Sequence, residues 1–220
     1  MQTEGNITPF CSSDYELPEG WRWVKLGDVL SEALPGFACG KRSGEEGTVQ
    51  LRMNNITTKG KIDLSSVLRV PASQEQIEKY RLLPGDVIFN NTNSAELVGK
   101  TALFDVEKDI FVYSNHLTRL RPLEGVLDSR YLALWLQLQW HQRVFEFICN
   151  RWIGQAAVQR DKLLGLEIPL APLPEQRRIA AKIQELMQEV ERARAACEKQ
   201  LEIAKTLSPV ILRRAFRGEL

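Results

Sequence analysis

Amide and guanidinium side chains in predicted loops and at predicted strand ends have the most evident binding chemistry in this chain. Arginine can donate paired hydrogen bonds to guanine in the major groove of DNA, and asparagine or glutamine can pair in the same way with adenine. Side chains of these types at such positions are Arg52, Asn54, Asn55, Asn90, Asn91, Asn93 and Gln155. A second group could hold phosphates, namely Lys59, Lys61, Lys100, Arg151 and Arg160. A plainer alternative applies to each asparagine, because asparagine in a loop often stabilises a turn.

The sequence lacks the signatures of the common catalytic sites. His116 and His141 are its only two histidines, so no multi-histidine metal site can form. No Asp/Glu-x-Lys tripeptide occurs, which removes the catalytic half of the common nuclease motif. Gly36, Gly40 and Lys41 are spaced one residue short of a P-loop, with Arg42 where Ser or Thr should stand. These absences favour a binding protein over an enzyme.

Composition sets further bounds. With 220 residues, 44% hydrophobic and 26% charged, the chain can hold one sizeable core, or one core with an appendage. A net charge of +1 means that any DNA contact must come from a local patch. Four scattered cysteines without a Cys-x-x-Cys pair indicate reduced thiols, and the most apolar stretch, 131–140, is too short and polar to span a bilayer. We therefore expect a cytoplasmic protein with no membrane partner.

Hydrophobic periodicity and turn residues predict an α+β fold. After a leader at 1–16, short β-like runs lie at 49–53, 62–64, 67–70, 86–90, 101–104, 110–113 and 116–121. A short helix is expected at 73–80, capped by Ser73 and Gln76, and a longer one from Asp128 or Ser129 to about 148. Residues 34–48 predict a mobile loop, and the proline-rich segment 168–174 predicts a stiff connector. Residues 17–172 are expected to form one β-rich domain.

The region 173–220 is expected to hold one long helix and a short basic one. No glycine or further proline occurs between Pro174 and about Thr206, and Ser208-Pro209 is expected to end the long helix. A heptad stripe runs along it, formed by Ile179, Ile183, Leu186, Val190, Ala193 and Cys197, and slips by one residue to Leu201. About 33 residues extend roughly 50 Å, longer than a small domain is wide. We therefore expect a partner helix; the alternative is a helix that folds back on its own domain.

A series of motifs runs along almost the whole chain. It begins with Leu17-Pro18-Glu19-Gly20-Trp21 and continues with Leu51-Arg52-Met53-Asn54-Asn55-Ile56 and Leu83-Pro84-Gly85-Asp86-Val87-Ile88-Phe89-Asn90. It ends with Gly154-Gln155-Ala156-Ala157-Val158 and Pro172-Leu173-Pro174-Glu175-Gln176-Arg177-Arg178-Ile179 before the heptads. In order and spacing this series resembles the specificity subunit of type I restriction–modification systems. Full-length members carry two recognition domains and two long helical regions, whereas this chain has one of each and no internal repeat.

The resemblance implies a function in DNA recognition without catalysis. The domain before the connector would read one half of a split site in double-stranded DNA. The long helix would pair antiparallel with a second copy, so a homodimer would read a palindrome interrupted by a spacer. The assembly would dock onto methyltransferase subunits, which bind S-adenosylmethionine, and a motor–nuclease subunit could join; this chain itself would bind no cofactor. The alternative from another class is a coiled-coil interaction or scaffold protein with no DNA role.

Overall fold

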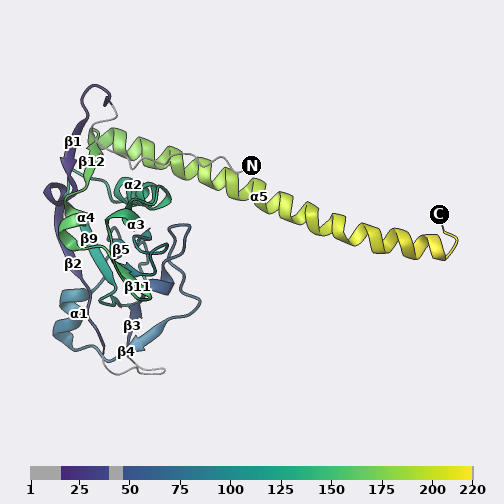
Figure 1. Ribbon diagram of the computed structural model, residues 1–220, viewed down its shortest axis with the longest axis horizontal. Coiled ribbons are helices and arrows are strands. Elements are labelled where there is room, and N and C mark those ends of the chain that lie inside the picture. The colour runs from purple at the N-terminus through teal and green to yellow at the C-terminus, as the bar shows by residue number, and fades with distance from the viewer. Residues whose placement is uncertain (1–15, 40–46, 220) are drawn as a thin grey trace. The chain divides into compact units, whose positions relative to one another are not determined.

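A computed structural model of the protein describes residues 16–39 and 47–219, except for the side chain of Ser208. The chain divides into two compact units, one through Arg177 and one from Arg178 onward. Short strands and helices form the first unit, and the second consists of one long helix (Figure 1). The predicted α+β class with a long C-terminal helix is confirmed. The predicted leader lies outside the described residues, apart from Glu16. Of the mobile loop predicted at 34–48, residues 40–46 also lie outside them, whereas residues 34, 35 and 48 belong to strands.

A four-stranded antiparallel sheet forms the centre of the first unit. Its order is β2-β9-β5-β7, with β2 at Leu30–Pro35, β9 at Leu117–Pro122, β5 at Val87–Asn90 and β7 at Thr101–Leu103. Every residue of β5 is buried, since a central strand has neighbours on both edges and side chains packed on both faces. The helix α2, at Ser129–His141, packs against β5, β7 and β9.

A second sheet, of order β4-β3-β8, shares the core with the first. β3 at Thr48–Leu51 pairs antiparallel with β4 at Leu68–Val70 and parallel with β8 at Phe111–Tyr113. A buried cluster includes Val49, Leu51, Ile56, Ile88, Phe104 and Tyr113. The 3-10 helix η3, at Met53–Asn55, follows directly after β3. Because Leu51 and Ile56, on either side of η3, are buried in this cluster, the position of η3 is fixed.

Two small sheets complete the first unit. β1 at Arg22–Lys25 pairs with β12 at Glu167–Leu170, and the 3-10 helix η2 follows at Leu26–Val29. β10 at Asn150–Trp152, β11 at Gln155–Ala157 and β6 at Thr92–Asn93 form a three-stranded sheet. A short helix, α4 at Arg160–Leu164, connects β11 to β12.

The predicted strands are confirmed with small shifts in their bounds, except for one. Residues 62–64 form no strand; Ile62 makes only an isolated bridge to Ile56. The stiff connector predicted at 168–174 was also only partly right, because its first residues belong to β12. Pro169 is tolerated there because a two-stranded sheet needs no hydrogen bond on its outer edge.

The two shorter helices begin as predicted, but one of them ends earlier than predicted. α1 at Gln74–Tyr80 begins with the predicted capping box between Ser73 and Gln76. Asp128 caps α2 as predicted, but α2 ends at His141 and a separate helix, α3, covers Val144–Ile148. Arg143 interrupts them with a left-handed backbone, φ +59°. This turn lets the buried ring of Phe145 pack edge-on against Phe89, with ring centroids 5.0 Å apart.

The long helix α5 covers Leu173–Phe216 without interruption, so the predicted break at Ser208-Pro209 is wrong. A proline inside a helix removes one backbone hydrogen bond, but the bonds on either side still hold the helical path. At its start, the buried amide of Gln176 donates to the carbonyl oxygens of Val126 and Ala171 and accepts from the backbone N–H of Asp128, at 2.8–2.9 Å. The first turn of α5 therefore belongs to the core of the first unit.

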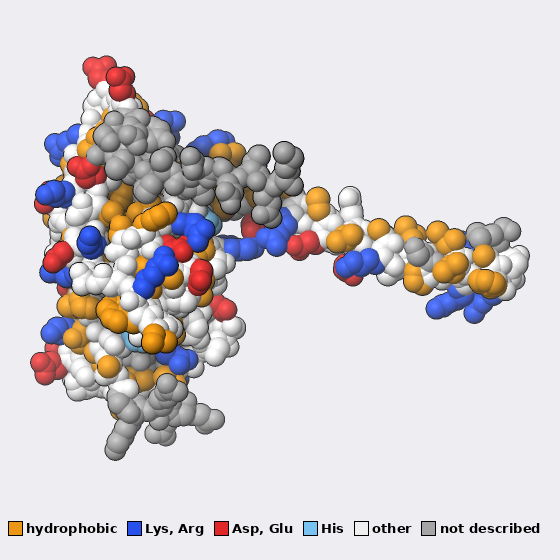
Figure 2. All heavy atoms as spheres, viewed as in Figure 1, with side chains coloured by type: hydrophobic (Ala, Val, Ile, Leu, Met, Phe, Trp, Pro, Cys, Tyr) orange, Lys and Arg blue, Asp and Glu red, His pale blue; other side chains and the backbone are white. Residues whose placement is uncertain are grey.

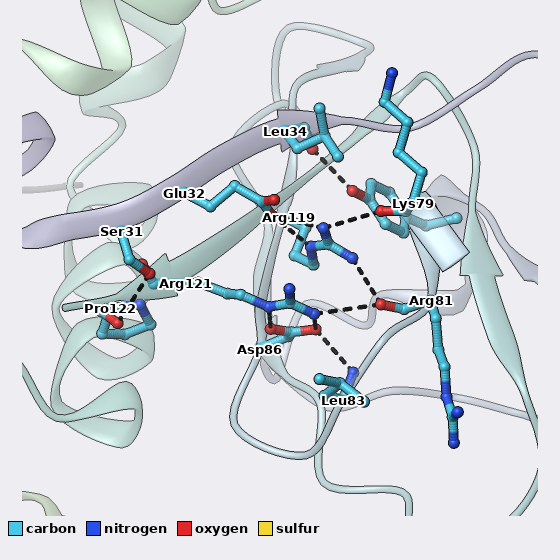
Figure 3. A network of polar contacts seen from close by, with 11 residues as sticks. Ser31, Glu32, Leu34, Lys79, Arg81, Leu83, Asp86, Arg119, Arg121 and Pro122 are labelled. Atoms are coloured by element: carbon cyan, nitrogen blue, oxygen red, sulfur yellow. Dashed lines mark hydrogen bonds and ion pairs between the residues drawn. The ribbon is translucent and has the colours of Figure 1, made fainter. Parts of the chain in front are cut away.

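A buried guanidinium group connects elements distant in the sequence (Figure 3). Arg119, 2% exposed, donates to Glu32 Oε1 at 2.8 Å and to the carbonyl oxygens of Arg81 and Lys79 at 2.6 and 3.1 Å. Its guanidinium carbon lies 5.6 Å from the ring centroid of Tyr113, whose hydroxyl donates to the carbonyl oxygen of Leu34. Burial raises the pKa of the Tyr113 phenol, so that hydroxyl stays protonated. β9 is thereby joined to β2, β8 and the end of α1.

Replacing Arg119 should therefore unfold the first unit more easily. We expect Arg119→Met to lower the free energy of unfolding by about 3–5 kcal/mol, since two carbonyl oxygens and Glu32 lose their donor. Urea titration monitored by tryptophan fluorescence measures this. The exposed Arg22 in β1 gives a matched control, and Arg22→Met should change the value by less than about 0.5 kcal/mol. Equal effects of the two substitutions would contradict the stabilising role of Arg119.

Candidate nucleic-acid interface

A pocket of about 230 Å³ lies between η3 and the turn that precedes β9. We call it the Arg52 pocket. Its lining combines apolar and polar side chains: Phe37, Ala38, Cys39, Gln50, Arg52, Met53, Asn54, Leu68, Ser114, Asn115 and His116. Two predicted DNA contacts, Arg52 and Asn54, are thus brought together in one concave site.

The backbone at one wall of this pocket comes unusually close to its neighbour. A Cβ atom at Gly36 would lie 2.3 Å from the carbonyl oxygen of Tyr113 and 2.4 Å from that of Ser114. Only glycine permits this approach. This close approach allows Phe37 to form a parallel bridge with Ser114. The ring centroids of Phe37 and Tyr80 then lie 4.9 Å apart. Phe37 and Ser114 are therefore fixed as adjoining parts of the wall.

Two predicted DNA contacts instead hold the turn that carries Arg52 and Asn54. Asn55, 2% exposed, accepts a hydrogen bond from the backbone N–H of Arg52 and donates to the carbonyl oxygens of Asp63 and Ser66, at 2.8–2.9 Å. The buried ammonium group of Lys100 donates to the carbonyl oxygens of Ile56 at 2.5 Å and Met53 at 3.3 Å. Burial lowers the pKa of Lys100. Because these polar groups are engaged inside the protein, we remove Asn55 and Lys100 from the candidate DNA contacts.

Three further candidates support the opposite side of the pocket. The amide nitrogen of the fully buried Asn90 donates to the carbonyl oxygen of His116 at 3.0 Å, and its amide oxygen accepts from Asn93 at 2.7 Å. The amide nitrogen of Asn91 donates to the carbonyl oxygen of Asn115 and to Thr118 Oγ1, at 3.2 and 2.8 Å. These bonds fix the backbone at 115–116. These hydrogen bonds favour the alternative of a turn-stabilising role for Asn90, Asn91 and Asn93, and base contact by these residues stays a prediction.

The β6–β11–β10 sheet gathers other candidates. Ala156 pairs with Asn93 on one side and with Arg151 on the other, while Gln155 pairs with Trp152. Gln155 is exposed, and Arg151 donates to Glu146 Oε1 at 3.3 Å and to its carbonyl oxygen at 3.0 Å. Exposed apolar side chains, Phe147, Trp152 and Ile153, lie on or next to this hairpin.

The remaining basic candidates are exposed and lie outside the Arg52 pocket. Lys59 and Lys61 belong to the turn after η3, and Arg160 is the first residue of α4. No signal in the sequence placed Phe37 and Gln50 in this pocket, and Ser114 was also missed. The signal for Ser114 was its place, directly between two predicted strands, where the chain must turn.

A second pocket of about 230 Å³ carries charges that already neutralise one another. It is lined by Ala95, Glu96, Val98, Trp140, His141, Arg143 and Glu146. Arg143 Nε donates to Glu146 Oε2 at 2.7 Å, and Glu146 also pairs with Arg151. Within the described residues, no group of three or more His, Cys, Asp or Glu side chains is arranged to hold a metal ion. We therefore place the candidate interface at the Arg52 pocket.

The predicted dimerisation stripe lies on α5 and is largely exposed. Ile179 and Ile183 are half-buried, while Leu186, Val190, Ala193, Cys197 and Leu201 are exposed. The exposed fractions of Leu186, Val190 and Leu201 are 47, 58 and 56%. Figure 2 shows hydrophobic side chains gathered along the last turns of this helix beside basic ones. None of the helices in the described ranges is long and apolar enough to cross a membrane.

A domain of this architecture, with a polar pocket and a long terminal helix, matches one known family of DNA-specificity domains. Residues 18–197 match the family described as "Type I restriction modification DNA specificity domain". Because the match covers most of the chain, the protein belongs to this family.

Relatives and solved structures agree with this assignment. The chain is 28% identical over 202 residues to the putative type I restriction enzyme MjaX specificity subunit of Methanocaldococcus jannaschii, covering 91% of this chain and 46% of that protein. It is 26% identical over 224 residues to the StySPI specificity subunit of Salmonella potsdam, covering 98% and 46%.

The crystal structure of the HsdS subunit from Thermoanaerobacter tengcongensis is similar with a TM-score of 0.65 and 26% identity, over 96% of this chain and 48% of that one. A chain from a structure described as "Structural basis underlying complex assembly and conformational transition of the type I R-M system" gives a TM-score of 0.73 and 26% identity, over 96% and 49%. The present chain spans about half the length of the relatives it matches. The resemblance inferred from the motifs is thereby confirmed.

Two neighbouring asparagines allow a direct test of which candidates support the site. We expect Asn55→Ala to lower the free energy of unfolding by at least about 2 kcal/mol, because two carbonyl oxygens and one N–H lose a buried partner. Asn54→Ala should change it by less than about 0.5 kcal/mol, because Asn54 is exposed. Thermal unfolding of both variants measures the difference. Equal stabilities would contradict the supporting role of Asn55.

Proposed function

We propose that this chain reads one half of a two-part site in double-stranded DNA for a type I restriction–modification complex. Residues 17–172 make the contacts with DNA, and the chain itself performs no catalytic step. The observation that carries this proposal is the Arg52 pocket: among the described residues, the side chains of Arg52, Asn54, Asn115 and His116 make no hydrogen bond inside the protein. Polar groups held at a fixed position but unengaged are those that a ligand can use.

Asn54 and Gln155 are the proposed base-reading side chains. Both are exposed, and each has an amide group of the type that pairs with the edge of adenine. Exposed cations, Lys59, Lys61, Arg151 and Arg160, would contact phosphates and so fix the register on the duplex. This division follows from exposure, because an amide engaged in buried bonds cannot also read a base.

The second part of the proposal concerns assembly. The region 173–220 would hold two copies together as a homodimer through antiparallel α5 helices, with Ile179, Ile183, Leu186, Val190, Ala193, Cys197 and Leu201 in the contact. Three long apolar side chains of this stripe are about half exposed, which supports a partner helix. Identical halves would make the site a palindrome with an unread spacer. In the cytoplasm, methyltransferase subunits, which bind S-adenosylmethionine, and a motor–nuclease subunit would join this dimer.

Sequencing of adenine methylation in cells that carry this chain with its methyltransferase subunit tests the function. We expect a new two-part, palindromic motif, absent from cells that carry the methyltransferase alone. Failure to find any new motif would favour a scaffold protein without a DNA role.

The same measurement tests base reading. Asn54→Ala should relax or change the methylated sequence at one position of each half-site, because an amide–adenine pair contributes about 1–3 kcal/mol of discrimination. Lys61→Ala, a loss of charge in the turn after η3, should reduce methylation equally at all sequences. An unchanged motif with Asn54→Ala would remove this residue from the base-reading set.

A separate measurement tests assembly. Leu186→Asp and Val190→Asp should turn the dimer into a monomer, because each places a charge in the proposed apolar contact. Light scattering at micromolar concentration gives the mass, and circular dichroism checks that the first unit stays folded. Glu189→Gln, between the two substituted residues, is the control and should leave the mass unchanged. A dimer that survives both aspartates would place the contact elsewhere.

A further inference from the structure

Two hydrogen-bond donors at the Arg52 pocket are buried without a partner among the described residues. Ser114 is 9% exposed, and its hydroxyl group is buried and unbonded. The Nε–H of Arg52 is in the same state. Burying a donor without a partner destabilises a protein, so native structures rarely leave two such donors beside one cavity unless something else binds them. Both residues line the pocket, which therefore offers a ligand two donors at fixed positions.

Arg52 differs from four arginines of the first unit that pair with carboxylates. Arg119 pairs with Glu32, Arg121 with Asp86, and Arg143 and Arg151 with Glu146. Arg52 pairs with no carboxylate of the described residues. Among the described residues that line the pocket there is no aspartate or glutamate, and Arg52 contributes a permanent positive charge.

The ligand that fits this arrangement accepts hydrogen bonds and is negatively charged. A DNA phosphate has both properties, and its volume is well below the roughly 230 Å³ of the pocket. The apolar side chains of Phe37, Met53 and Leu68 in the lining lower the local dielectric constant, which strengthens the attraction between the guanidinium group and an anion. A guanine-reading arginine places two of its N–H groups on the O6 and N7 atoms of the base. The Nε–H of Arg52 is instead buried at the wall of the pocket, where only a ligand group that enters the pocket can accept from it.

We propose that the Arg52 pocket binds one backbone phosphate of the recognised DNA, with Arg52 Nε and Ser114 Oγ as the donors. Arg52 then sets the register of the domain on the duplex and does not read a base. The adjacent Asn54 is held by the same turn, so the phosphate fixes the position from which this amide reaches a base edge. This inference rests on the proposed DNA-recognition function. It assigns a phosphate to Arg52, whereas the residue type alone suggests a guanine base.

The test pairs a protein substitution with a DNA substitution in the chain assembled with its methyltransferase subunit. DNA duplexes carrying the methylated motif are prepared with one neutral methylphosphonate at a time. For the unsubstituted chain, one position in each half-site should weaken binding about tenfold. In Arg52→Ala that position should lose its effect, and the slope of log affinity against log salt should fall by about 0.9 per site. Arg22→Ala, which removes an exposed arginine outside the pocket, should retain the sensitive position and the slope.

Ser114→Ala separates binding from folding. Because the hydroxyl group has no partner inside the protein, its removal should leave the thermal unfolding midpoint unchanged or raise it, while DNA binding weakens severalfold at all sequences. A changed sequence preference in Arg52→Ala, or a methylphosphonate position that stays sensitive in this variant, would overturn the inference while leaving DNA recognition intact. If the unsubstituted complex shows no preference for any DNA sequence, the proposed function fails as well.

Discussion

Arg119 holds together parts of the first unit that lie far apart in the chain. Its guanidinium group reaches Glu32 in β2 and the last carbonyl groups around the end of α1, and it lies over the ring of Tyr113 in β8. Tyr113 precedes Ser114, and the tyrosine at the end of α1, Tyr80, packs on Phe37. The contacts of Arg119 thus hold Ser114 and Phe37, which form two walls of the Arg52 pocket. A buried guanidinium group is tolerated there because its N–H groups are hydrogen-bonded.

Polar side chains that are hydrogen-bonded inside the protein hold the other walls. Asn55 and Lys100 fix the turn that carries Arg52 and Asn54, while Asn90 and Asn91 fix the backbone of Asn115 and His116. These side chains have the chemistry to contact DNA, but their hydrogen bonds inside the protein make them supports of the site. The side chains without such bonds remain able to contact DNA. This order gives the proposed recognition site a rigid base, which is needed if small differences between base pairs are to be told apart.

The sequence predicted the fold class, most strands of the central sheets, the caps of two helices and the family. Hydrophobic periodicity and capping residues are local signals, and they were sufficient to predict these strands and helix caps. It failed at Arg143 and Pro209, because the ends of helices there depend on packing and on the number of intact neighbouring bonds. It could not separate Asn54 from Asn55, which are identical in type and adjacent. Only the fold buries one of them against Asp63 and Ser66 and exposes the other. Ser114 was missed because its place between two predicted strands indicates a turn but not a binding site.

The most direct test of DNA recognition by this chain is selection from a random pool of duplex DNA by the chain assembled with its methyltransferase subunit, followed by sequencing of the retained duplexes. A recognition domain that acts as one of two identical readers should enrich a sequence in two inverted halves around a spacer of constant length and free composition. Retained DNA with no common sequence, or with a single unsplit motif, would contradict this function.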